Sequence, residues 1–149
     1  MLFRSNKIEA LVASREAPPV VRAEALRPRL GPGVRDDTSE LAGTLSAQPR
    51  TASGQLLDDV AGYRFAVVGE PAVLSGTTDR TKALLESFGA HVLEEFSGEV
   101  RDWVTGLGAA AVIIRPDRYL FGAAGNSAEL NALVAALETT LLPSAVPAP

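Results

Sequence analysis

Few side chains in this sequence could carry out covalent or acid–base chemistry. The 149 residues contain no cysteine and one histidine, His91. Without cysteine, the chain lacks disulfides, iron–sulfur ligands and a thiolate nucleophile. One histidine excludes a His-rich metal site and leaves a Ser-His-Asp triad a single possible base.

Hydroxyl side chains gather in the stretch from Gly69 to Asp79, where Ser75, Thr77 and Thr78 follow a run of apolar residues. Hydroxyl groups just before a helix accept hydrogen bonds from its first backbone N–H groups. We therefore expect them to cap the helix that follows, with binding of a polar ligand as the alternative. A serine nucleophile activated by His91 is disfavoured, because no motif connects the two residues.

Carboxylates occur in two groups. Asp58 and Asp59 are adjacent, and adjacent side chains of an extended segment point apart, so they make a poor metal site. We expect them to be solvated or to cap a helix. Glu94, Glu95 and Glu99 form an acidic patch, which we also expect to be a solvated face.

The stretch Gly106–Ala111 matches the dinucleotide-binding pattern G-x-G-x-x-A. That pattern binds a pyrophosphate only when a strand precedes it and a helix follows it. Here a predicted helix precedes the glycines and a predicted strand follows them. The pattern therefore indicates a glycine-rich helix end rather than a nucleotide site.

The most distinctive string is Arg115-Pro116-Asp117-Arg118-Tyr119. Proline favours the first central position of a turn and aspartate the next, so the string predicts a hairpin turn with an Arg–Asp contact. The alternative is an Arg115 that binds an anion or faces an interface. We favour the turn, because a turn alone accounts for the proline and the aspartate.

Charge and composition exclude several partner classes. Apolar residues make up 46% of the chain, charged residues 21%, and the net charge is −4. An acidic chain argues against nucleic-acid binding, and no apolar run reaches the roughly 20 residues of a membrane span. Residues 1–35 have a net charge of +4 and residues 36–149 a net charge of −8, which indicates two segments of different character. Lacking a convincing targeting segment, the chain is expected to be cytoplasmic.

Residues 63–142 carry a regular pattern of strands and helices. Strands are predicted at 65–68, 91–93, 111–114 and 119–121, and helices at 79–88, 98–107 and from Asn126 to Pro143, with caps at Thr77 or Thr78, Ser97 and Asn126. The order β-α-β-α-β-β-α implies right-handed crossovers in the β-α-β units and an antiparallel hairpin at the β-β step. We therefore predict an α/β fold, a small mixed sheet in the thioredoxin-like arrangement.

The remaining residues differ in character. Residues 1–62 are expected to form an irregular, partly helical connecting arm, with a short helix over Phe3–Arg15 that ends at Pro18-Pro19. Five of the ten prolines fall in this arm, so we expect it to be disordered or to lie against another surface. Residues 143–149 are expected to be a flexible tail. No catalytic, cofactor-binding or metal-ligating residue is assigned anywhere in the chain.

Three blocks in order resemble one protein family. They are Ala111–Gly122 (AVIIRPDRYLFG), the pair Gly43–Arg50 and Gly54–Val60 (GTLSAQPR and GQLLDDV), and Leu26–Gly33 (LRPRLGPG). They resemble the C-terminal thioredoxin-like domain of FAD-dependent aromatic hydroxylases, of the 3-(3-hydroxyphenyl)propionate hydroxylase and polyketide hydroxylase types. The family often has glycine where this chain has Arg118, so a turn with positive φ there would strain Arg118.

The resemblance implies a family activity and a missing part. The family hydroxylates aromatic rings with FAD, NAD(P)H and oxygen, yet its flavin-binding motifs have no counterpart in this sequence. We therefore expect a structural or oligomerisation portion of such a monooxygenase, redox-inactive and inactive alone. Its expected partner is a flavin-binding domain, in the same chain or a separate one, and a homo-oligomer is possible. A stand-alone binding module without catalytic activity is the main alternative, and an unrelated small enzyme is a weaker one.

Overall fold

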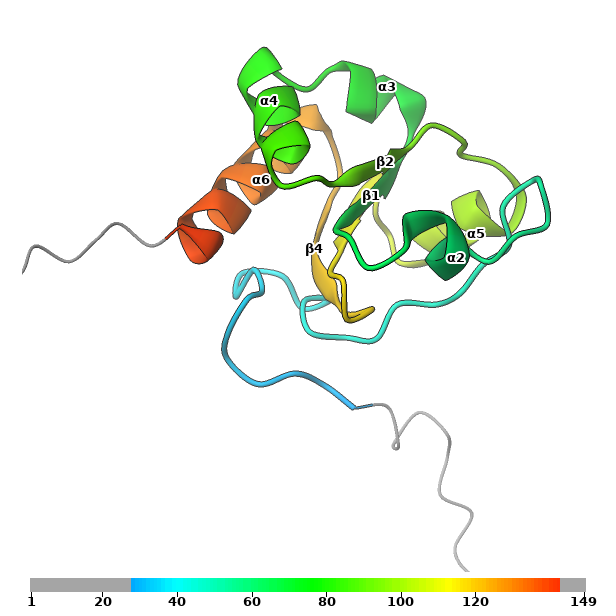
Figure 1. Ribbon diagram of the computed structural model, residues 1–149, viewed down its shortest axis with the longest axis horizontal. Helices are drawn as coiled ribbons and strands as arrows, with labels where there is room; N and C mark the ends of the chain where they lie inside the picture. Colours follow the sequence, from blue (N-terminus) through cyan, green and yellow to red (C-terminus); the bar gives the residue numbers. More distant parts are fainter. Residues whose placement is uncertain (1–27, 143–149) are drawn as a thin grey trace, which may run out of the picture.

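The computed structural model describes residues 28–142 (Figure 1). Its centre is a four-stranded sheet of β1 (Ala66–Gly69), β2 (His91–Leu93), β3 (Ala111–Ile114) and β4 (Leu120–Ala124), in the order β2-β1-β3-β4. Strands β1 and β2 are parallel, whereas β3 is antiparallel to both β1 and β4. The predicted α/β class, mixed sheet and final hairpin are confirmed.

One detail of the predicted topology is wrong. The second crossover does not join parallel strands, because β3 lies on the far side of β1 from β2 and runs antiparallel to β1. The right-handed crossover rule applies only to parallel strands, so it governs the β1–β2 connection alone.

Helices cover both faces of the sheet (Figure 1). On one face lie α3 (Pro71–Ser75), α4 (Asp79–Ser87) and α6 (Ser127–Leu141), and on the other lie α2 (Leu57–Ala61) and α5 (Gly98–Gly106). Helix α3 was not among the helices predicted for residues 63–142, the first of which began at residue 79. Pro71 begins it, because a first-turn proline loses no intrahelical hydrogen bond.

Two apolar cores result, one on each face of the sheet. Val67 and Ile113 pack toward α3, α4 and α6, whereas Val68 and Val112 pack toward α2 and α5. Every residue of β1 and β3 is buried, because side chains alternate between two covered faces. That double burial explains why both strands read as continuous apolar runs in the sequence.

The predicted helix caps divide into two that form and one that does not. Thr78 Oγ1 accepts a hydrogen bond from Thr81 N at 3.2 Å, and Asn126 Oδ1 accepts one from Glu129 N at 2.9 Å. Ser97 precedes α5 but makes no side-chain cap bond. Its hydroxyl donates instead to the Glu95 carboxylate at 3.1 Å, so the predicted Ser97 cap is wrong.

Residues 28–56 are hereafter called the connecting segment, and part of this segment lies along the outer edge of β4. Gly43 N donates to Leu120 O, and Leu120 N donates to Thr44 O, both at 2.9 Å. Asp36 N donates to Phe121 O at 2.8 Å, at the point where a bulge shifts the β3–β4 register. The surface that this part of the predicted arm lies against is therefore the edge of the sheet in the same chain. The helix predicted over Phe3–Arg15 and the tail over 143–149 fall outside the described residues.

Two glycine substitutions test the packing between strands. A Cβ at Gly69 would lie 2.5 Å from Ala111 Cβ and 3.0 Å from Ala110 O, with no flexible side chain to yield. Gly69→Ala should destabilise the protein by about 1–3 kcal/mol, the usual cost of overpacking. Gly106→Ala is the matched control, because a Cβ there meets nothing within 4 Å and lies in α5. Urea unfolding should show the control as stable as, or more stable than, the parent; equal losses would contradict the packing.

Candidate functional site

The turn at 115–119 forms as predicted. Arg115 N donates to Tyr119 O at 2.8 Å, and Arg118 N donates to Arg115 O at 3.0 Å. The Arg115 guanidinium pairs with Asp117 Oδ2 at 2.6 Å, which confirms the predicted Arg–Asp contact. A second guanidinium nitrogen of Arg115 donates to the carbonyl of Val34. Arg115 therefore faces the connecting segment rather than an open surface, and its side chain is only 18% exposed.

Arg118 occupies the left-handed region at φ 71°, as the comparison with glycine-containing relatives predicted. Its Nε lies 3.4 Å from Asp58 Oδ2, and a terminal nitrogen donates to Asp58 O at 3.2 Å. The guanidinium also lies 5.8 Å from the centre of the Tyr63 ring. These contacts hold a non-glycine residue in a strained conformation, which only a well-determined surrounding permits.

Asp58 corrects the sequence analysis, which expected a solvated or helix-capping acid. Its carboxylate accepts from Gln48 Nε2 and pairs with Arg118, and its side chain is 12% exposed. Asp59 is exposed, as expected. Within residues 28–142, no three His, Asp or Glu side chains are grouped as metal ligands.

The acidic patch is also more engaged than predicted. The Glu95 carboxylate accepts from the backbone N–H of Ala52, and Glu99 Oε2 accepts from Arg50 N at 2.8 Å. Glu94 is exposed, as predicted. Two carboxylates of the domain thus bind the backbone of the connecting segment. Arg115, Arg118, Asp58, Glu95 and Glu99 are hereafter called the clasp, because each joins residues 28–63 to the sheet or its loops.

The hydroxyl cluster serves local structure. Ser75 and Thr77 donate to the carbonyls of Ala72 and Leu74 at 3.2 and 2.7 Å, and Thr78 caps α4, as expected. Asn131 on α6, which the sequence analysis did not single out, accepts from Thr78 N at 3.1 Å. The sequence offered one signal for this role, because Asn131 is the only polar residue in the apolar stretch 130–137.

His91 begins β2 and is partly buried. Burial lowers the pKa of His91 below its ordinary value of 6.5, and the positive charge of Arg64 lowers it further, whereas Glu94 acts in the opposite direction. His91 is therefore neutral near pH 7. The hydroxyls of Ser75 and Thr77 are bonded to backbone carbonyls, and nothing in the described part of the chain pairs His91 with a nucleophile.

The reversed glycine pattern is confirmed as a helix end. Helix α5 ends at Gly106, and β3 begins at Ala111, so no helix N-terminus follows the glycines. Gly108 adopts φ 72°, the left-handed conformation that commonly ends a helix.

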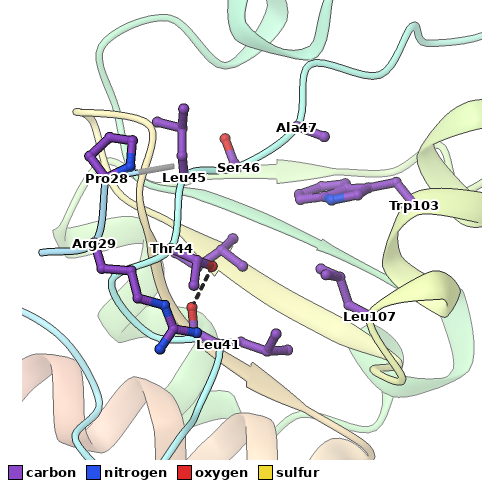
Figure 2. Close-up of a pocket in the computed structure, with 10 residues that line it drawn as sticks. Pro28, Arg29, Leu41, Thr44, Leu45, Ser46, Ala47, Trp103 and Leu107 are labelled. Atoms are coloured by element: carbon purple, nitrogen blue, oxygen red, sulfur yellow. Dashed lines mark hydrogen bonds between the residues drawn. The ribbon is translucent and has the colours of Figure 1, made fainter. Parts of the chain in front are cut away.

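A groove that the sequence did not reveal lies between α5 and the connecting segment (Figure 2). Its volume is about 790 Å³. The apolar lining comes from two parts of the chain, with Trp103 on α5 and Leu107 just after it facing Leu41 and Leu45 of the connecting segment. Its lining residues are Pro28, Arg29, Leu41, Thr44, Leu45, Ser46, Ala47, Trp103, Leu107 and Leu120.

No helix in the described part of the chain is long and apolar enough to cross a membrane.

Comparisons with known proteins agree with the expected resemblance. Residues 72–140 match the family model described as the HcaD C-terminal domain. The probable NADH-specific resorcinol 4-hydroxylase of Rhodococcus jostii (strain RHA1) is 33% identical over 123 residues, covering 72% of this chain. The rebeccamycin biosynthetic enzyme RebC matches in its substrate-free form with a TM-score of 0.53 and 19% identity, over 89% of this chain. Another RebC structure, native and K252c-bound RebC-10x, gives a TM-score of 0.53 at 18% identity over 91% of this chain.

The structural match shows that the chain has an α/β fold like that of a domain in RebC. Together with the two sequence matches, it confirms the resemblance to the C-terminal domain of FAD-dependent aromatic hydroxylases. The chain spans 23% of the resorcinol hydroxylase and 26% of RebC.

Glycine usually makes a protein less stable than alanine at the same position, but the positive φ of Arg118 predicts the opposite order for two variants. Arg118→Ala and Arg118→Gly both lose the contacts with Asp58, but only glycine adopts φ 71° freely. We expect the glycine variant to be more stable than the alanine variant by about 1 kcal/mol in urea unfolding. An alanine variant equal to or more stable than the glycine variant would contradict the strained geometry.

His91 predicts a pH dependence of stability. A lowered folded-state pKa means that the unfolded chain takes up a proton near pH 6.5 that the folded chain does not. The contribution is therefore present above pH 6.5 and is lost as pH falls through 6.5 toward the lower folded pKa. As pH falls through this range, the free energy of unfolding of His91→Asn should therefore decrease less steeply than that of the parent protein. The same pH dependence in both proteins would contradict the lowered pKa of His91.

Proposed function

We propose that the chain is the C-terminal, redox-inactive thioredoxin-like portion of a monooxygenase that hydroxylates aromatic rings with FAD and NAD(P)H. Its role in such an enzyme is structural: it packs against a flavin-binding domain, in the same chain or a separate one, and contributes to oligomerisation. It is inactive alone and cytoplasmic. Residues 63–142 form the domain, preceded by the arm over 1–62 and followed by the tail.

One observation carries this proposal. The side chains that could have done chemistry are engaged in holding the fold together. Arg115, Arg118 and Asp58 bind one another or the connecting segment, and Glu95 and Glu99 accept its backbone N–H groups. A flavin or nicotinamide site needs free polar groups that converge on the ligand. The match to only 23% of a hydroxylase also supports a part of a larger enzyme rather than a complete one.

A stand-alone binding module is a second candidate, and the groove beside Trp103 is the observation that favours it. An apolar hollow beside polar groups is typical of a ligand or partner site. This candidate predicts a protein with a partner of its own rather than a flavin domain.

A chimera separates the two candidates. Residues 28–142 of this chain would replace the part of the Rhodococcus resorcinol hydroxylase that they match. We expect the chimera to retain bound flavin and NADH oxidation stimulated by resorcinol, whereas the same enzyme with that part deleted should lose both. This chain alone, mixed with FAD, NADH and resorcinol, should oxidise no NADH above the protein-free rate.

The control chimera carries Arg115→Ala and Arg118→Ala, which should weaken the clasp and lower the yield of flavin-bound enzyme. Oxidation of NADH by the chain alone would overturn the proposal, because it would place an active site within these residues. A chimera no better than the deletion would favour the stand-alone binding module.

A further inference from the structure

The groove between α5 and the connecting segment has a volume of about 790 Å³, and most of the residues that line it are apolar. Leu45 is 49% exposed at its rim although it is a large aliphatic side chain. Trp103 is only partly buried, and it faces the hollow together with Leu107 (Figure 2). Apolar side chains presented together on one concave surface mark a site that another segment or molecule covers.

The groove is also where the described chain begins. Pro28 is one of the lining residues and lies beside Leu45 (Figure 2). The 27 residues that precede it in the sequence are joined to the rim of the groove. A covalently attached segment has a high effective concentration at such a surface, so even weak contacts suffice to hold it.

Residues 1–27 contain apolar side chains at a spacing that suits an apolar groove. Ile8, Leu11 and Val12 are spaced i, i+3, i+4, the spacing of one apolar helical face that fills an apolar groove. Residues 1–27 have five basic and three acidic residues, a net charge of +2, whereas residues 36–142 have a net charge of −8, so the segment is attracted to the acidic domain as a whole. Arg29 is the only charged residue among those that line the groove, so the apolar contacts and the attachment at Pro28 place the segment in the groove itself.

We propose that residues 1–27 of this chain dock in the groove, with Ile8, Leu11 and Val12 against Trp103 and Leu45. This inference is independent of the proposed monooxygenase role, because it concerns how the chain covers its own apolar surface, but it competes with the stand-alone binding module for the same groove. It assigns an occupant to the groove: the chain's own N-terminal segment rather than a small ligand or a second copy.

Trp103 provides a site-specific reporter, because it is the only tryptophan in the chain. The experiment uses the full-length protein and two triple variants. Ile8→Asp, Leu11→Asp and Val12→Asp place charges on the apolar face. Asn6→Asp, Ala10→Asp and Ala13→Asp place the same three charges on the opposite face. We expect the first variant to show a red-shifted Trp103 emission and stronger acrylamide quenching, and the second to match the parent.

A direct proximity measurement keeps the proposal testable if the quenching changes are small. Because the chain has no cysteine, Arg15→Cys creates a unique attachment site for a bimane dye, whose emission tryptophan quenches on contact. Position 15 follows Ile8 by two helical turns, so it falls on the same face as the three apolar residues. We expect quenching that Trp103→Phe relieves, whereas a dye attached through Ala148→Cys should be insensitive to Trp103→Phe.

Two results would overturn the proposal. The first is a bimane at position 15 that is indifferent to Trp103→Phe, combined with identical Trp103 quenching in the parent and both triple variants. The second is protection of Trp103 that disappears on dilution, because it would identify a second copy of the chain as the occupant. Protection that is independent of protein concentration and lost only in the apolar-face variant supports the docked segment.

Discussion

Strand β4 ends the sheet, and its outer backbone groups need hydrogen-bond partners. Within the described residues, the connecting segment supplies them through Gly43, Thr44 and Asp36. An uncovered edge strand would present unpaired N–H and C=O groups to other chains. The pairing also sets the position of everything that follows in the segment, including the loop at 50–54 and helix α2, whose Leu57 and Ala61 complete the core on one face of the sheet.

The clasp is best understood as support for that pairing. Each backbone hydrogen bond contributes only about 1 kcal/mol, and the connecting segment has few buried apolar residues to hold it. Charged side chains at the turn, in α2 and around the start of α5 therefore bind the segment at several separate points. Charge-assisted hydrogen bonds of this kind are stronger than neutral ones, and they fix geometry as well as adding energy. Side chains used in this way are not free to bind a substrate or cofactor.

The sequence predicted the local structure of the domain well, because strong apolar periodicity and cap residues determine it. The strands predicted at 65–68 and 111–114, which form at 66–69 and 111–114, and the caps at Thr78 and Asn126 depend on neighbouring residues only. The roles of Asp58, Glu95 and Glu99 could not be predicted, because each also binds a distant residue, Arg118, Ala52 and Arg50 respectively, that lies 43 to 60 residues away along the chain. The groove was missed for the same reason: α5 and the connecting segment approach only in the folded structure. Arg118 was the exception, because the resembling family often has glycine at this position of the turn. An arginine there predicted a strained backbone, and Arg118 does adopt a positive φ.

Native-state hydrogen exchange on the full chain tests most directly whether the connecting segment is part of the folded domain. The decisive amides are Asp36 and Gly43, which donate to β4, and Arg50, which donates to Glu99. The account predicts that Asp36 and Gly43 exchange as slowly as the amides of β4 and with the same dependence on denaturant, because they open in one cooperative unit. Arg50 should also be protected, and Glu99→Gln should weaken its protection more than that of Gly43. Exchange of Asp36 and Gly43 at the rate of an unstructured peptide, while β1 and β3 stay protected, would contradict the account.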